Sequence, residues 1–369
     1  MTIASLLKSA KSAYKGERAN LVCEILLAHF LGQKRVFLHA NSEKKISEIL
    51  NFSAESSKKN PCEAPENSPA SWCKKSGEAS SSASADFLLE AEKRGSPPKS
   101  EKRQLLARRG SGAGGAALLR EETSDFKKQS SNSTLRFTSP QALELTLLQS
   151  ISLLNNGYPL EYITKKVSFY GMDFFIDDGA LIPRPETEIL VDKATQLITH
   201  HNIQQIYEIG TGSGIIAITL CLQNPHIKIT ATDISPTALQ IAQKNIALKS
   251  TLDSTLKSRI RLICADLLQG TDFAPKDSLI ISNPPYIAED YALPKNVAHE
   301  PKIALFGGKK GDEILRKIIA LNADFLCCEI GHNQGYLADF LGAYKSVEFY
   351  KDYAGFTRGF VARRVCLSG

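Results

Sequence analysis

The chain has 369 residues, a formal net charge of +6 and 43% hydrophobic residues, which allows two domains with ordinary cores. The positive excess is small for this length and no basic stretch is interleaved with aromatic residues, so we expect no direct nucleic-acid partner. The eight cysteines lack metal-ligand spacing, and no signal peptide or membrane span is visible. Together these features predict a cytoplasmic protein with no metal and no membrane contact.

The first 155 residues predict a small helical domain that is interrupted by an insertion. Apolar residues recur at helical spacing within residues 1–50 and again from about 140 to 154. Residues 51–135 contain seventeen serines and a glycine-rich run, a composition that cannot bury enough apolar surface to offset the entropy lost on ordering. We therefore predict a largely disordered insertion, and we favour a tolerated surface insertion over a docking or regulatory arm.

The rest of the chain predicts a hairpin followed by a layered α/β domain. Residues 156–180 are expected to be a linker that becomes a β-hairpin around Gly171. Strands and helices then alternate through residues 181–369, and the last two strands, near 347–350 and 359–365, are expected to pair antiparallel. Seven strands of this kind predict a doubly wound sheet with ligands at the carboxyl ends of its strands, near the switch point.

A proline-rich loop precedes the first helix of this domain. Pro185 is expected near the first turn of that helix, where its missing N–H has no cost. Glu186 and Glu188 suit the positive end of the helix dipole. A structural role is therefore sufficient to explain both carboxylates.

A glycine-rich turn follows the first strand of the sheet. Residues 205–209 predict a strand, and the apolar residues 215–220 open a helix. A strand, a tight glycine turn and a helix N-terminus form a nucleotide-binding corner, where glycine lets the backbone approach a ligand. The third glycine falls one residue early for G-x-G-x-x-G and Ile215 is bulky, which counts against a nicotinamide oxidoreductase. The candidate ligand-binding residues of this corner are Glu208, Gly210, Thr211, Gly212, Ser213 and Gly214.

Acidic residues end the next two predicted strands. Asp233 follows residues 227–232 and is placed to accept hydrogen bonds from ribose hydroxyls. Asp266 and Leu267 follow residues 260–264 and are placed to flank an adenine. Two structural alternatives remain: Asp233 as the N-cap of the following helix, and Asp266 as a turn residue.

The sequence N-P-P-Y at residues 283–286 follows a short apolar run and ends a buried strand, because two prolines cannot continue a sheet ladder. It presents the amide of Asn283, the carbonyls of Pro284 and Pro285 and the ring of Tyr286. Such a set suits a flat, neutral NH₂ group, since carbonyl oxygens accept its two N–H bonds and the ring covers its face. The alternative is a simple chain reversal.

With these motifs the chain resembles the class I S-adenosylmethionine-dependent methyltransferases, and within them the protein-(glutamine-N5) methyltransferases that modify peptide chain release factors. N-P-P-Y is shared with adenine-N6 DNA methyltransferases and some guanine-N2 RNA methyltransferases, but L-I-P-R-P-E-T-E at residues 181–188 is typical of the release-factor enzymes. The resemblance covers roughly residues 1–50 and 136–369. Other matching segments are P-L-E-Y-I at 159–163, E-P at 300–301, A-L-F-G-G at 304–308, E-I-G at 329–331, K-D-Y at 351–353 and R-G at 358–359.

The resemblance implies a seven-stranded class I methyltransferase sheet in residues 181–369 and a small N-terminal helical domain for substrate docking. It implies methyl transfer from S-adenosyl-L-methionine to the N5 amide nitrogen of the glutamine in the Gly-Gly-Gln loop of class I release factors. Asn283, Pro284 and Tyr286 are then the expected catalytic residues. They are also expected to bind the substrate together with Pro285 and Arg184, and Asn283 is expected to contact the donor as well. The 181–188 loop would close over the reacting site, with Arg184 holding the substrate backbone or a neighbouring carboxylate.

The chain departs from the family pattern at two places. Lys310-Gly311 stands where family members often have Asp-Gly, so we assign that loop no catalytic role. Leu267 stands where some relatives have an aromatic residue.

Two other functions compete with this interpretation. A nucleic-acid amine methyltransferase would need a flipped base and a basic phosphate-binding surface, which the modest charge does not favour. A non-catalytic protein that retains the fold is opposed by the intact glycines, Asp233 and Asn283.

Overall fold

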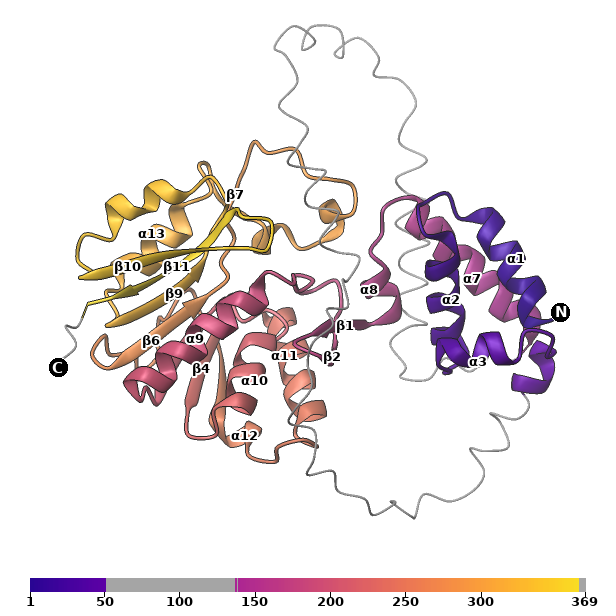
Figure 1. Ribbon diagram of the computed structural model, residues 1–369, viewed down its shortest axis with the longest axis horizontal. Helices are drawn as coiled ribbons and strands as arrows, with labels where there is room; N and C mark the ends of the chain where they lie inside the picture. The colour runs from indigo at the N-terminus through magenta and orange to yellow at the C-terminus, as the bar shows by residue number, and fades with distance from the viewer. Residues whose placement is uncertain (51–136, 138, 365–369) are drawn as a thin grey trace, which may run out of the picture. The chain divides into compact units, whose positions relative to one another are not determined.

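The computed structural model describes residues 1–50, 137 and 139–364, and divides the chain into two compact units, Met1–Thr164 and Lys165–Gly369 (Figure 1). The insertion predicted at 51–135 lies outside the described residues. The division at 164/165 falls within the segment 156–180 that was predicted to link the two domains. The boundaries predicted at 155 and 180 themselves stay predictions. Among the described residues, no helix combines the length and apolar character needed to cross a membrane.

The first unit is helical. It contains α1 (Ile3–Ala13), α2 (Ala19–Phe30), α3 (Arg35–Ala40), α7 (Pro140–Asn155) and α8 (Leu160–Thr164). Helix α7 begins where expected because Ser139 accepts a hydrogen bond from the Ala142 N–H and Pro140 occupies the first turn. Helices α1, α2 and α7 contact one another around fully buried Leu6 and Leu147. Helix α8 lies within the segment that was expected to be a linker.

The second unit begins with the predicted hairpin and contains a seven-stranded sheet. The hairpin pairs β1 (Lys166–Phe169) with β2 (Met172–Phe175). The sheet has the order β10-β11-β9-β6-β3-β4-β5, in which only β10 and β11 run antiparallel to their neighbours. This arrangement confirms the predicted doubly wound fold. The strands are β3 (Gln205–Ile209), β4 (Lys228–Asp233), β5 (Ile260–Cys264), β6 (Ser278–Ser282), β9 (Phe325–Glu329), β10 (Ser346–Lys351) and β11 (Thr357–Arg363).

Helices cover both faces of this sheet (Figure 1). Helix α10 contacts both α9 and α11, while α13 buries Leu315 and Ile318 in a cluster with Tyr207 and Ile280 of the sheet. The helices are α9 (Thr187–His201), α10 (Ile215–Gln223), α11 (Pro236–Lys249), α12 (Leu256–Arg259) and α13 (Glu313–Ala320), with 3₁₀ turns η2 (Val297–His299), η3 (Lys302–Ala304) and η4 (Gly335–Phe340).

The strand register brings the predicted motifs to one edge. Ile209, the last residue of β3, pairs with Thr232 of β4 on one side and with Ser282 of β6 on the other. The residues that follow Ile209, Thr232 and Ser282 therefore lie next to one another at the carboxyl edge of the sheet. Because the chain runs outward from β3 through β4 to β5 and then returns to β6 on the other side of β3, this edge is the switch point of the sheet, where doubly wound folds bind ligands.

Two local features differ from expectation. Pro185 lies before α9 and its N-cap Glu186, rather than in the first turn, and the Glu186 side chain makes no capping bond. Glu188 does lie in the first turn, but its Oε1 accepts the Tyr170 N–H at 2.7 Å and so ties α9 to the hairpin. A short parallel pair after N-P-P-Y, β7 (Ile287–Ala288) with β8 (Phe306–Gly308), was not predicted.

Candidate active site

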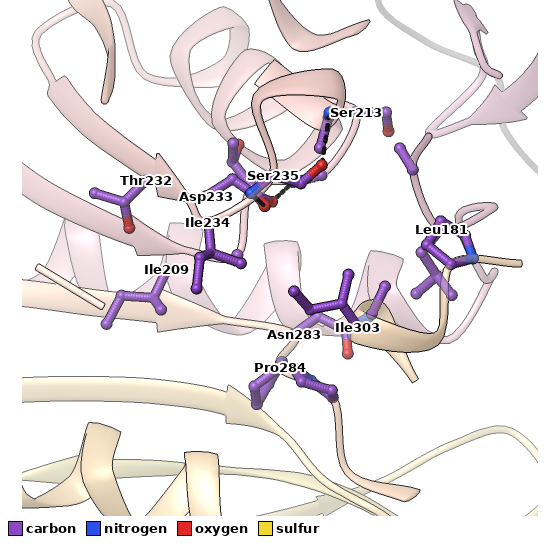
Figure 2. Close-up of a pocket in the computed structure, with 18 of the residues that line it drawn as sticks. Leu181, Ile209, Ser213, Thr232, Asp233, Ile234, Ser235, Asn283, Pro284 and Ile303 are labelled. Atoms are coloured by element: carbon purple, nitrogen blue, oxygen red, sulfur yellow. Dashed lines mark hydrogen bonds between the residues drawn. The ribbon is translucent and has the colours of Figure 1, made fainter. Parts of the chain in front are cut away.

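A pocket opens at the carboxyl ends of β3, β4, β5 and β6 (Figure 2). Because β3 lies between β4 and β6, Asp233 and Asn283 face it from opposite sides of Ile209. Ten of the predicted site residues line this pocket: Gly210, Thr211, Gly212, Ser213, Asp233, Asp266, Leu267, Asn283, Pro284 and Pro285. Four lie outside its lining: Arg184, Glu208, Gly214 and Tyr286.

The glycines of the turn divide into two kinds. Gly210 and Gly212 have φ angles of 73° and 55°, and a Cβ built on either would meet no described atom within 4 Å. Their backbone therefore borders open pocket, in a cradle that side chains would fill. Gly214 instead faces α11, where its Cβ would lie 3.0 Å from the Ala242 Cβ. Gly214 thus permits close packing of α10 against α11.

Asp233 holds the glycine turn in place. Its Oδ2 accepts the Gly212 N–H and its Oδ1 accepts the Ser235 N–H, both at 2.8 Å. Ser235 caps α11, so the alternative that made Asp233 the N-cap is wrong. Burial raises the pKa of Asp233, while these backbone bonds act in the opposite direction. Each carboxylate oxygen has a second lone pair, which leaves capacity for ligand hydroxyls.

Asp266 and Leu267 line the pocket at the end of β5. The Asp266 carbonyl accepts the Gln269 N–H at 3.1 Å, so Asp266 is a turn residue as well as a pocket residue. Leu267 adopts a left-handed backbone with φ 51° and packs against the hydrophobic cluster that contains Ile209. Its placement beside an adenine remains a prediction.

Glu208 lies beneath the glycine turn and is fully buried. Its Oε2 accepts the Thr211 hydroxyl at 2.8 Å, whereas its Oε1 has no partner among the described residues. Burial raises the pKa of Glu208 to about 8. At neutral pH the folded protein therefore favours a protonated carboxyl at this position.

Replacing Glu208 by glutamine is expected to reduce the loss of stability at high pH. The folded pKa lies above the ordinary 4.5, so the contribution of Glu208 is fully present below pH 4.5 and is lost as pH rises through about 8. That loss amounts to a few kcal/mol, at about 1.4 kcal/mol per pKa unit. Urea unfolding at pH 5 and pH 9 measures it, with exposed Glu289→Gln as the control. Parallel pH profiles for Glu208→Gln and the wild type would contradict the prediction.

Asn283 is held by a hydrogen-bond chain that crosses the pocket wall. Its Nδ2 donates to the Thr187 Oγ1 at 3.1 Å, and that hydroxyl donates to the Glu329 Oε2 at 2.8 Å. The Tyr286 hydroxyl donates to the Glu329 Oε1 at 3.3 Å. Sequence reasoning missed Thr187 and Glu329 as site residues, although both lie in segments that carried the family resemblance. The sequence signal that could have identified Glu329 is that an acidic residue ends β9, the strand that pairs with β6.

Arg184 is tied to a carboxylate of its own chain. Its Nη2 lies 2.5 Å from the Glu300 Oε1, and the Glu300 Oε2 accepts the Ile182 N–H at 3.0 Å. The Glu300 side chain is only 2% exposed. Pro183 and Pro301, which neighbour this pair, both line the pocket. Of the two partners considered for Arg184, the described contacts therefore favour the neighbouring carboxylate.

Replacing Arg184 by alanine is expected to lower the free energy of unfolding by about 3 kcal/mol, because it leaves Glu300 buried and uncompensated. Urea unfolding at pH 7 measures the change. The control is Arg261→Ala, since Arg261 makes an exposed contact of 3.9 Å with Asp272 and should cost less than about 1 kcal/mol. Unchanged stability with a large loss in kcat/KM would instead assign Arg184 to the substrate.

Comparison with known proteins gives one family model and a set of curated relatives. The Methyltransferase small domain model matches residues 187–301. Release factor glutamine methyltransferase of Koribacter versatilis is 38% identical over 173 residues, which is 46% of this chain and 59% of that protein. The enzyme of the same name from Aquifex aeolicus is 33% identical over 239 residues, covering 61% of this chain and 82% of that protein.

One solved structure that the comparison matches is the hMettl16 catalytic domain in complex with MAT2A 3′UTR hairpin 6. It has a TM-score of 0.42 and 18% identity, and the match covers 67% of this chain and 91% of that one.

Proposed function

The chain belongs to the release factor glutamine methyltransferases, and from that membership we propose its reaction: transfer of a methyl group from S-adenosyl-L-methionine to the N5 side-chain amide nitrogen of the glutamine in the Gly-Gly-Gln loop of class I peptide chain release factors. Methylation of that glutamine supports translation termination. One observation carries the proposal: the Nδ2 of Asn283 is engaged by Thr187, so Oδ1 remains to accept from an NH₂ group in the pocket.

The donor is held by the glycine turn and the strand ends. The open space beside Gly210 and Gly212 suits a nucleoside ligand that lies against bare backbone. Asp233 accepts from the ribose hydroxyls, while Asp266 and Leu267 flank the adenine. When bound, S-adenosyl-L-methionine supplies the methyl group on a sulfonium leaving group.

The acceptor is held by the carbonyl oxygens after β6. An amide nitrogen is a poor nucleophile because its lone pair is shared with its carbonyl. The Asn283 Oδ1 and the Pro284 backbone carbonyl accept its two N–H bonds and fix the nitrogen for in-line attack. The same oxygens stabilise the positive charge that develops on nitrogen during transfer. No metal and no dedicated base are needed, since the protonated, N-methylated amide is very acidic.

Tyr286 follows the pocket residues Asn283, Pro284 and Pro285 and lies outside the pocket lining. Its ring packs against the hydrophobic cluster of the sheet and its hydroxyl is bonded to Glu329. The prediction that the ring covers the substrate amide stays part of the proposal, with Pro285 as a further contact. Burial raises the pKa of Tyr286 far above its ordinary value, so the phenol stays protonated and acts as a hydrogen-bond donor.

The partner is a class I release factor, with the helical residues 1–50 and 139–155 as the docking surface for a second region of that protein. Its substrate belongs to the translation machinery, which favours a cytoplasmic location. Direct nucleic-acid or membrane partners are not part of the proposal.

Methyl transfer from labelled donor to a purified release factor tests the acceptor class. Parallel reactions contain its Gln→Ala variant in the Gly-Gly-Gln loop, tRNA, rRNA and duplex DNA. Label on the wild-type factor alone is the expected result. Label on a nucleic acid would favour the amine methyltransferase alternative, and donor binding without label on any acceptor would favour a non-catalytic protein.

A further inference from the structure

Glu329 is a buried carboxylate at the carboxyl end of β9, and the proposed reaction gives it no role. It is 1% exposed, and the described residues form no ion pair with it: the nearby Arg358 donates two bonds to Asp352, at 2.8 and 3.1 Å. A buried carboxylate without a direct ion pair costs stability. Folding alone therefore gives no reason for an acid at this position.

Both oxygens of Glu329 are directed at groups that serve the N-P-P-Y motif. Oε2 accepts from Thr187, whose oxygen accepts from the Asn283 amide, while Oε1 accepts from the Tyr286 hydroxyl. One carboxylate thus braces the acceptor-binding amide and the aromatic ring together. Thr187 is 2% exposed and lines the pocket, so the brace reaches the pocket itself.

The chemistry of a hydroxyl group gives the series of hydrogen bonds from Asn283 through Thr187 to Glu329 a direction. A threonine hydroxyl has one hydrogen to donate and two lone pairs. An ionised carboxylate can only accept, so it takes the Thr187 hydrogen and leaves only lone pairs facing Asn283. The Asn283 amide must then present its NH₂ to Thr187 and its oxygen to the pocket. Without the Thr187 hydroxyl, the two amide orientations would differ much less in energy.

We propose that Glu329, acting through Thr187, is a positioning residue that keeps the Asn283 oxygen turned toward the acceptor nitrogen. This inference rests on the proposed function and adds a determinant of acceptor specificity to it. An amide oxygen selects a neutral NH₂ donor, whereas a reversed Asn283 amide would present NH₂ and select a carboxylate.

Protonation of Glu329 on Oε2 reverses the direction of these hydrogen bonds. The protonated oxygen donates to Thr187, whose hydrogen then turns to Asn283. Burial raises the pKa of Glu329 to about 7. The groups facing it are the hydroxyls of Thr187 and Tyr286 and the charges of Arg358 and Glu186, with Tyr350 alongside. Arg358 and both hydroxyls favour the carboxylate, and Glu186 disfavours it.

Three substitutions test the role of the hydrogen bonds that join Glu329, Thr187 and Asn283. Thr187→Val keeps the shape and removes the hydroxyl, while Thr187→Ser keeps the hydroxyl. Glu329→Gln keeps the size and can donate to Thr187, which favours the reversed direction. We expect single-turnover transfer to a release factor at saturating donor to fall about 10- to 100-fold in Thr187→Val and Glu329→Gln, and less than about threefold in Thr187→Ser. The donor Kd should change less than about threefold in all three.

Two further readouts separate positioning from a structural role. The first is the ratio of affinities for the release factor and its Gln→Glu variant in the Gly-Gly-Gln loop, which should fall in Thr187→Val and Glu329→Gln and persist in Thr187→Ser. The second is pH: the wild-type rate divided by the Glu329→Gln rate should rise as pH increases through about 7.

The outcomes distinguish this inference from the proposed function. If the wild type methylates the release factor and Thr187→Val matches Thr187→Ser in rate and in the Gln-to-Glu ratio, the positioning role is overturned and the function stands. An equal loss in both Thr187 variants would also overturn it, since the hydroxyl would then not be the determinant. No transfer by the wild type to any release factor would overturn both.

Discussion

Replacing Asn283 by alanine is expected to lower kcat by about 10²- to 10³-fold, the loss typical of removing one group that stabilises charge in a transition state. Asn283 provides the only side-chain carbonyl of the N-P-P-Y motif at residues 283–286, and its Nδ2 is held by Thr187. Without it the acceptor nitrogen keeps one of its two hydrogen-bond acceptors, the Pro284 carbonyl. Single-turnover kinetics at saturating donor measure the effect.

Donor binding separates this role from a donor-binding role. The donor Kd of Asn283→Ala, measured by calorimetry, should change less than about threefold, because Asp233 at the end of β4 and the glycine turn after β3 border the pocket and are left intact. The control is Asn333→Ala, which changes an exposed residue outside the pocket lining and should leave both quantities unchanged. Equal losses in kcat and donor affinity would mean that Asn283 is chiefly a donor ligand.

Replacing Asp233 by alanine is expected to raise the donor Kd by about 10- to 100-fold, since hydrogen bonds to a charged group contribute about 1.5–3 kcal/mol. The substitution removes the acceptor for ribose hydroxyls and also releases the Gly212 N–H, which Asp233 holds at 2.8 Å. Two contributions to donor binding are therefore lost together. Calorimetric titration with S-adenosyl-L-methionine measures the change.

The kinetic pattern for Asp233→Ala is the reverse of that for Asn283→Ala. At saturating donor its kcat should fall by less than about fivefold, because the acceptor contacts after β6 are intact. Asp233→Asn should have an intermediate Kd, as it keeps one accepting oxygen. Asp290→Ala removes the same charge at an exposed position and serves as the control. A wild-type Kd in Asp233→Ala would remove Asp233 from the donor site.

Local sequence patterns were sufficient for the fold and for one edge of the site. The strands at 205–209 and 260–264 and the terminal antiparallel pair were all expected near their observed bounds. Strand-to-turn motifs at Gly210, Asp233 and Asn283 were expected at one sheet edge, and the register places them there. These predictions succeed because carboxyl ends of parallel strands share an edge whatever the loop lengths.

The sequence by itself determined the elements, their order and the residues that end each strand, because periodicity, glycine and proline act within a few residues of chain. Only the tertiary structure decided which side chains meet across that edge. Thr187 and Glu329 are 142 residues apart, and Arg184 and Glu300 are 116 apart. Such pairs depend on which strands become neighbours and on how the loops fold over the pocket. No pattern within a few residues of sequence predicts a hydrogen bond between residues that are more than 100 positions apart.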